Sequence, residues 1–177
     1  MDSFLKLGTR GSPLALAQAR LAATGDPRTV PLPRPLVGSG EPHFSFAGLK
    51  SAVQRAVASG KHEPPDIAAS FQQAMVDCMV DRTALALDRS DSATLVVAGG
   101  VAANRALRAA LAELAERYRR GFSVPPSWLC TDNAAMIGWA GAERLAAGFT
   151  DGLDAPARAR WPLDEAAEKV RGAGVKA

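Results

Sequence analysis

Two short motifs carry residues that could bind a ligand. In the first, Gly99 and Gly100 follow the strand-like run 94–98, and Asn104 stands four residues after the second glycine. Glycines between a strand and a helix let a ligand approach the backbone without a Cβ in the way, and the first N–H groups of the helix point toward it. This pattern indicates a seat for a phosphate or a nucleotide.

The second motif spans residues 130–133 and contains Asp132 at the expected start of another helix. A carboxylate in this position either caps the helix or ligates a metal, and the residue alone does not decide between the two. Asn104 is ambiguous in a similar way, because its amide binds either a ligand's sugar hydroxyls or its own backbone. The two histidines, His43 and His62, have no second histidine at helical spacing, so this chain does not build a histidine-pair metal site by itself.

The elements expected to position these motifs are mostly helices. Apolar residues recur at helical spacing in four segments, and each segment has a cap or a glycine stop. The expected helices are one that contains Leu49, Val53 and Val57 and ends at Gly60, then one that Asp66 caps and that ends near Asp88, then 101–120, and then 133–147 with Gly148 as its stop; the expected strands are 43–46, 94–98 and 128–130. Strands that alternate with helices indicate an α/β layered structure, here with a narrow sheet and exposed edges.

We divide the chain into four segments: 1–20, 21–47, 48–163 and 164–177. The first is atypical, and its dipeptide Ser12-Pro13 predicts a helix start. The second is a connector rich in proline and glycine, because proline withholds a backbone donor and biases its predecessor away from helix. The third holds the helices and strands, and the fourth is expected to be a flexible tail.

Composition sets limits on the class of protein. With 177 residues, of which 47% are hydrophobic, the chain can bury one core of ordinary size. A formal charge of +3 and a pI near 9.2 permit an RNA or nucleotide partner without requiring one. Cys78 and Cys130 indicate reduced thiols and not a disulfide framework or a four-ligand zinc site. Because no apolar run or signal sequence stands out, we expect a soluble cytoplasmic protein.

Six motifs in fixed order carry a resemblance to one family. They are PLPRP at 31–35, FSFAGLK at 44–50, DIAASFQ at 66–72, AGGVAANR at 98–105, CTDNAAMI at 130–137 and RWPL at 160–163. From about Leu21 onward the chain therefore resembles the C-terminal part of the tRNA threonylcarbamoyladenosine transferases, formerly called glycoproteases or O-sialoglycoprotein endopeptidases.

The resemblance implies an actin-like fold of the sugar-kinase and Hsp-type ATPase kind, with this chain supplying mainly the helix-rich C-terminal lobe. It implies transfer of a threonylcarbamoyl group from threonylcarbamoyl-adenylate to the adenosine adjacent to the anticodon of tRNA, in the cytoplasm, together with other proteins of the threonylcarbamoylation complex. By motif, Gly99, Gly100 and Asn104 would bind the nucleotide, and Asp132 would ligate iron or zinc. No side-chain nucleophile is needed, because an amine that attacks a mixed anhydride needs mainly positioning and electrostatic help.

Two departures from the family pattern bear on activity. We expect the usual N-terminal half, with its histidine pair and its own nucleotide loop, to be absent, which leaves Asp132 as a lone ligand. In its place residues 6–19 resemble the opening of hydroxymethylbilane synthase, where Arg10 and Ser12 would approach pyrrole carboxylates. Three functions stay open: a transferase that is incomplete as a lone chain, a noncatalytic fragment or interaction subunit, and, with the least sequence behind it, tetrapyrrole biosynthesis. Apolar surface left uncovered by the missing half should favour association.

Overall fold

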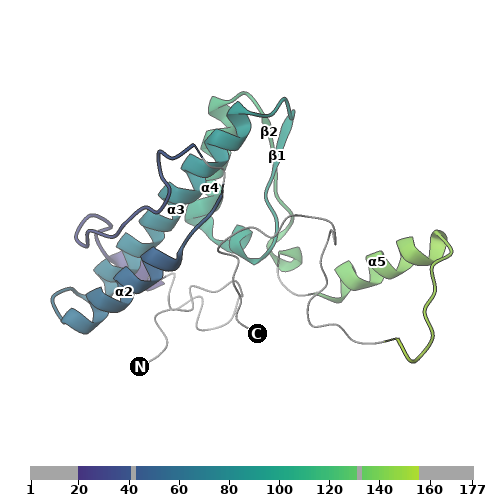
Figure 1. Ribbon diagram of the computed structural model, residues 1–177, viewed down its shortest axis with the longest axis horizontal. Helices are drawn as coiled ribbons and strands as arrows, with labels where there is room; N and C mark the ends of the chain where they lie inside the picture. Colours follow the sequence, from purple (N-terminus) through teal and green to yellow (C-terminus); the bar gives the residue numbers. More distant parts are fainter. Residues whose placement is uncertain (1–19, 41–42, 131–132, 156–177) are drawn as a thin grey trace. The chain divides into compact units, whose positions relative to one another are not determined.

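The computed structural model describes residues 20–40, 43–130 and 133–155. It divides into two compact units, Met1–Asn133 and Ala134–Ala177. In the described part, the first unit contains α2 (Ala47–Ser59), α3 (Pro64–Asp88), β1 (Thr94–Val96), η2 (Gly100–Ala103), α4 (Arg105–Arg117), β2 (Gly121–Ser123) and η3 (Ser127–Leu129), and the second contains α5 (Ala134–Ala146). Figure 1 shows these elements along the chain.

The longest element is α3, whose 25 residues extend over about 37 Å. It begins at Pro64 and ends at Asp88. The predicted end near Asp88 is confirmed, and the predicted start is not. The predicted cap at Asp66 was wrong, because the helix begins two residues earlier and includes Pro64 and Pro65. Proline suits these first positions, since the backbone N–H that it lacks would have no partner within the helix. The Asp66 carboxylate instead accepts a hydrogen bond from the backbone N–H of Asp26, at 2.9 Å.

Helix α3 is shared by two hydrophobic clusters. It packs against α2 on one side and against α4 on the other, as Figure 1 shows. The side chain of Met75 packs against both clusters. The buried members are Val30, Leu32, Leu49, Ala52, Val53, Ile67 and Ala74 in the first cluster and Val76, Leu87, Leu107, Leu111 and Leu114 in the second. At roughly 1.5–3 kcal/mol for each large aliphatic side chain, this burial is the main force that holds the helices together.

The predicted apolar face of α2 is confirmed in part. Leu49 and Val53 are buried, whereas Val57 is 45% exposed. At 3.6 residues per turn, eight residues rotate position 57 by about 80° from position 49, so it leaves the buried face. The predicted stop at Gly60 is confirmed, because this residue has a φ of 63° and its N–H bonds to the carbonyl oxygen of Val57.

Residues 26–40, which we call the strap, run alongside α3. The described residues 25–40 contain neither helix nor strand, as the connector prediction required, although 20–24 are helical. Polar contacts join the strap to α3 and to its C-cap, Arg89, at successive points. They are Asp26 N to Asp66 Oδ1, Val30 N to Ser70 Oγ, Arg34 Nε to Asp77 Oδ2, Arg82 Nη1 to Ser39 O and Arg89 Nη2 to Gly40 O, all between 2.7 and 3.2 Å. Because the partners advance together along both segments, the strap runs in the same direction as the helix.

The sheet that the structure describes has two parallel strands. Leu95 of β1 lies opposite Phe122 of β2, and both side chains pack against the second hydrophobic cluster. The predicted strand at 94–98 is confirmed for its first three residues. The predicted strands at 43–46 and 128–130 were wrong. The stacked rings of Phe44 and Phe46 belong to an irregular segment, and 127–129 form a 3₁₀ turn after Pro125-Pro126, whose nitrogens cannot donate to a ladder.

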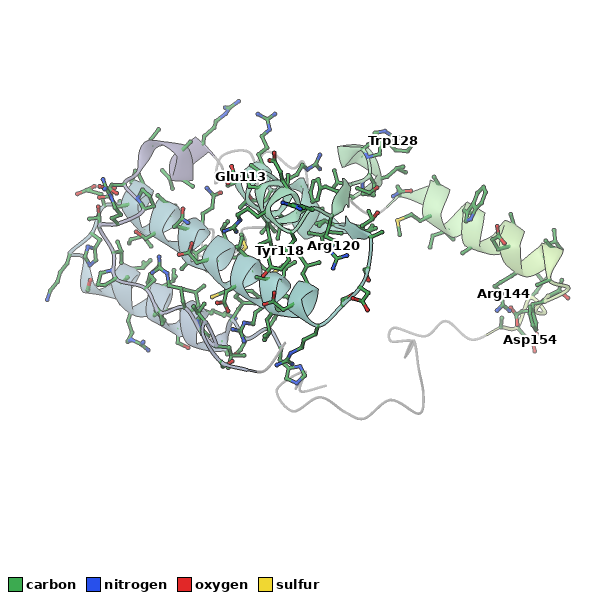
Figure 2. The ribbon with its side chains drawn as sticks, turned by 90° about the horizontal axis from the view of Figure 1, so that it is seen from above. Glu113, Tyr118, Arg120, Trp128, Arg144 and Asp154 are labelled. Atoms are coloured by element: carbon green, nitrogen blue, oxygen red, sulfur yellow. The ribbon has the colours of Figure 1, made fainter. Side chains whose placement is uncertain are left out.

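The second unit consists of α5 and the chain that follows it. This helix ends two residues before Gly148, whose φ of 79° confirms the predicted stop. Arg144, labelled in Figure 2, donates to Asp151 at 3.0 Å and lies over the ring of Phe149. None of the described residues of α5 is buried, and Ile137 and Trp139 are 76% and 71% exposed. In the described part of the chain, no helix has both the length and the apolar character required to cross a membrane.

Replacing Gly25 with alanine should destabilise the first unit. A Cβ at this position would lie 2.1 Å from the carbonyl oxygen of Pro65, so two backbone segments would have to separate. We expect the urea midpoint to fall by an amount that corresponds to roughly 1–3 kcal/mol. Gly40→Ala is the matched control, because its Cβ would meet nothing within 4 Å. Equal losses in the two variants would contradict the close approach.

Ser70→Ala should weaken the attachment of the strap. Ser70 is 1% exposed, and its hydroxyl accepts the N–H of buried Val30 at 3.2 Å. Alanine leaves that N–H unpaired, which costs about 1–3 kcal/mol in the free energy of unfolding. Thermal unfolding followed by circular dichroism measures the loss. Ser51→Ala serves as control, because among the described residues this exposed hydroxyl donates just to Ala47 O in its own helix. A similar loss there would count against the explanation.

Candidate functional site

The glycine turn, residues 99–104, lies between the end of β1 and the start of α4. Gly99 has a φ of 78°, in the left-handed region that favours glycine, and a Cβ built on it would meet nothing within 4 Å. Gly100 begins the 3₁₀ turn η2, and the N–H of Ala102 donates to Gly99 O at 3.0 Å. The predicted helix start at 101–104 was therefore one turn early, because the 3₁₀ turn intervenes. The surface beside Gly99 is open to a ligand.

Asn104 is the N-cap of α4. Its Oδ1 accepts the backbone N–H of Leu107 at 3.0 Å, and its Nδ2 donates to Gln72 Oε1 at 3.3 Å. Of the two roles that the sequence left open, the structure shows the bond to the backbone. The cap also fixes the amide's orientation, since Oδ1 must be the acceptor. The Nδ2 group has a second hydrogen, so a ligand contact at this atom is compatible with the cap.

Arg108, which lies near the start of α4, holds the glycine turn in place. Its Nε and Nη2 both donate to the carbonyl oxygen of Ala102, at 3.1 and 2.8 Å. Ala102 is fully buried, so its carbonyl would otherwise lack solvent. The guanidinium also places a positive charge beside the N-terminus of α4, where the helix dipole favours anions. The turn thus combines an open backbone, a helix N-terminus and a fixed cation.

Gln72 and Arg108 were not among the predicted site residues. Gln72 closes the motif at 66–72, but nothing in the sequence shows that it meets Asn104. Arg108 stands four residues after Asn104, and that spacing puts both on one face of a helix. This signal was available in the sequence, whereas the contact with Gln72 depends on the packing of α4 against α3.

The predicted metal ligand, Asp132, lies outside the described residues. Its neighbours are placed: Cys130 is buried with its Sγ 3.5 Å from Pro125 O, and Asn133 Nδ2 donates to Leu129 O at 3.3 Å. Within the ranges that the structure describes, no group of three or more His, Cys, Asp or Glu side chains could hold a metal ion. The described residues therefore do not form a metal site by themselves, and the role of Asp132 stays a prediction.

Cys78 is unsuited to act as a nucleophile. Its side chain is buried within the helical packing of α3, at 2% exposure. Burial, with a smaller contribution from the neighbouring Asp77 carboxylate, raises the pKa of the Cys78 thiol above its usual value. A neutral buried thiol is inert.

Comparisons with known proteins point to one family. The profile of the family described as tRNA N6-adenosine threonylcarbamoyltransferase matches residues 1–139. Curated proteins of that name are similar to the chain: one from Sphingopyxis alaskensis is 66% identical over 99% of this chain and 52% of its own length, and one from Novosphingobium aromaticivorans is 65% identical over 98% and 49%. A third, from Zymomonas mobilis, is 57% identical over 98% and 48%. The chain thus spans about half the length of the curated relatives it matches.

The family match also bears on the N-terminal segment. It begins at residue 1 and so includes 6–19, for which we predicted a likeness to hydroxymethylbilane synthase. Arg10 and Ser12 lie outside the described residues, and that likeness stays a prediction.

Arg108→Met should loosen the glycine turn. The variant keeps most of the side chain's apolar length but removes both hydrogen bonds to Ala102 O, which should cost about 1 kcal/mol in the free energy of unfolding. Amide exchange at Ala102, whose N–H bonds to Gly99 O, should become faster as well. Arg105→Met is the control, since Arg105 is exposed and makes no hydrogen bond to the described residues. If both variants exchange alike at Ala102, the arginine does not hold the turn.

Proposed function

The chain belongs to the tRNA N6-adenosine threonylcarbamoyltransferase family, and from this premise we propose that it binds the adenylate donor for a threonylcarbamoyl transfer to tRNA. The acceptor in this proposal is the adenosine adjacent to the anticodon. The observation that carries the proposal is the glycine turn, in which open backbone, a capped helix N-terminus and Arg108 meet. The narrow parallel sheet with helices is compatible with part of an actin-like fold, which we propose for the whole enzyme.

Gly99, Asn104 and Arg108 each have a role in the proposal. The donor's phosphate would lie at the N-terminus of α4, where N–H groups of the first helical turn have no partner within the helix. Gly99 admits the close approach, and Asn104 Nδ2 would donate its second hydrogen to a ribose hydroxyl. Arg108 would stabilise the charge that develops on the phosphate as the AMP part of the donor leaves. The tRNA amine attacks the carbonyl of the mixed anhydride directly, so the chain contributes orientation and electrostatic stabilisation.

For Asp132 we keep the role of ligand to a divalent metal, iron or zinc. A carboxylate together with imidazoles suits such an ion, and we propose that the imidazoles come from the other half of the enzyme. When bound, the metal would supply positive charge that polarises an oxygen of the donor.

The partners in this proposal are threonylcarbamoyl-adenylate, tRNA and other proteins of the threonylcarbamoylation complex, in the cytoplasm. A second candidate is a noncatalytic fragment or interaction subunit. Because the chain spans about half the length of the relatives it matches, the assay that separates the two candidates is run with and without the other half. Tetrapyrrole synthesis rests on residues 6–19 alone, and no described residue supports it.

A transfer assay separates the two candidates. Labelled threonine, bicarbonate, ATP and a donor-making enzyme are combined with tRNA and this chain, with and without a separately supplied N-terminal half. We expect no modified tRNA from the chain alone and modification once the second half is present. Transfer by the chain alone would overturn the requirement for a second half, and no transfer in either case would favour the noncatalytic role.

Asn104→Asp should separate the cap from ligand binding. The carboxylate keeps the cap acceptor and suits a helix N-terminus, and the Gln72 amide can turn its Nε2 donor toward it in place of the present bond from Asn104 Nδ2. We therefore expect the free energy of unfolding to change by less than about 0.5 kcal/mol. The variant loses the Nδ2 donor and repels a phosphate, which should weaken adenylate binding about tenfold or more. Calorimetric titration with ATP, with the second half present, measures this. Asn104→Ala should lose both cap and affinity, and undiminished binding by Asn104→Asp would remove Asn104 from the site.

A further inference from the structure

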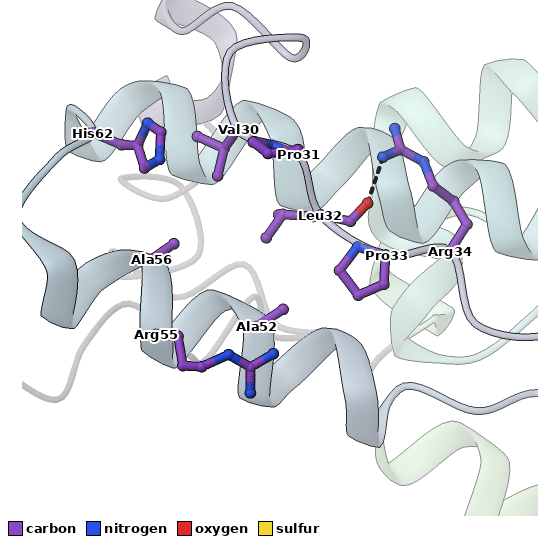
Figure 3. Close-up of a pocket in the computed structure, with 9 residues that line it drawn as sticks. All are labelled: Val30, Pro31, Leu32, Pro33, Arg34, Ala52, Arg55, Ala56 and His62. Carbon is purple, nitrogen blue, oxygen red and sulfur yellow. Dashed lines mark hydrogen bonds between the residues drawn. The ribbon is translucent and has the colours of Figure 1, made fainter.

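A hollow lies on the first unit, between the strap and α2. Its volume is about 570 Å³, and Figure 3 shows the strap along one side and α2 along the other. The lining residues come from three elements: the strap, α2 and the loop before α3. They are Val30, Pro31, Leu32, Pro33, Arg34, Ala52, Arg55, Ala56 and His62. None of them belongs to the glycine turn, so this is a separate site.

The hollow is apolar at its base and basic at its edge. Val30 and Leu32 are buried beneath it, whereas the ionisable lining residues are Arg34, Arg55 and His62. None of the lining residues that the structure describes is acidic. The sequence around α2 has the same bias: residues 43–62 include three Lys or Arg and two His, but no Asp or Glu. An anion brought to this surface therefore meets no local repulsion from carboxylates along α2.

The three basic side chains differ in what they contact. Arg34 donates to Asp77 Oδ2 at 2.9 Å and to Leu32 O at 2.7 Å, which fixes the strap and neutralises part of its charge. Arg55 is exposed, and neither its side chain nor that of His62 makes a hydrogen bond or ion pair with the described residues. Two nitrogen-bearing side chains with unused hydrogen-bonding capacity, one from α2 and one from the loop that follows it, thus border the same hollow.

We propose that this hollow binds a backbone phosphate of the tRNA, a proposal that rests on the transferase function above. The forked donors of Arg55 suit a phosphate's oxygens, and the imidazole N–H of His62 adds a further donor. The bordering Pro31, Pro33 and Arg55 are exposed, so the hollow is shallow. Pockets for small ligands usually enclose most of the ligand, whereas an RNA backbone needs only to pass over such a surface. The site positions RNA and carries no base specificity.

Binding of a fluorescently labelled tRNA transcript to the full 177-residue chain tests this proposal, by anisotropy in 50–200 mM salt. Arg55→Ala removes one phosphate contact and should weaken binding about tenfold at 50 mM salt. The difference in affinity between the wild type and the variant should shrink roughly three- to fourfold by 200 mM salt, because each phosphate contact adds about 0.9 to the slope of log affinity against log salt concentration. His62→Ala should also weaken binding. Lys50→Ala is the matched control: it removes a positive charge from the same helix, but Lys50 does not line the hollow.

The outcomes distinguish this proposal from the transferase function. If Arg55→Ala and Lys50→Ala lose equal affinity while the wild type binds tRNA, the hollow is not the contact, and the transferase proposal stands. If the wild-type chain, with or without its second half, binds no tRNA at any salt concentration, both proposals fall. Binding of millimolar pyrophosphate that is lost in Arg55→Ala, with no effect of that variant on tRNA binding, would make the hollow a site for free phosphate and overturn the RNA assignment.

Discussion

Helix α3 has apolar side chains on two faces. The first unit is held together by the hydrophobic cluster that packs on each face. One cluster brings in α2 and the strap, the other brings in α4 and the two strands, and Met75 contacts both. Between them a polar row accepts the strap through Asp66, Ser70 and Asp77. The prolines of the strap lack a backbone N–H, so the strap cannot form a regular helix or sheet. Its remaining buried polar groups still need partners, and side chains of α3 supply them.

The candidate site depends on the same helix. Gln72 of α3 bonds Asn104, Asn104 caps α4, and Arg108 holds the carbonyl oxygen of Ala102. These contacts fix the glycine turn before any ligand arrives, which lowers the ordering cost of binding. The hollow between the strap and α2 depends on α3 as well, because Arg34 reaches Asp77 from its edge. Both sites that we propose are therefore placed by one helix.

Local signals in the sequence were sufficient for most helices but not for the contacts between them. Gly60 and Gly148 end their helices as predicted, because a left-handed glycine is a local stop. The strand at 121–123 was missed because three residues are too few to show an alternating pattern, and it forms only by pairing with β1. The glycines and Asn104 of the site could be found from their motif. The bonds of the strap and of Gln72 join residues more than thirty positions apart, which no local pattern reveals.

Residue-level amide hydrogen exchange tests the dependence on α3 most directly. Among the described residues, the N–H groups of Asp26 and Val30 have acceptors on α3 alone, at 2.9 and 3.2 Å. If the helix holds the strap, these two amides exchange slowly, at rates within about tenfold of those in α3, because both open in the same cooperative event. If they exchange as fast as an unstructured chain while the α3 amides stay protected, the strap is not held by the helix, and the account is contradicted.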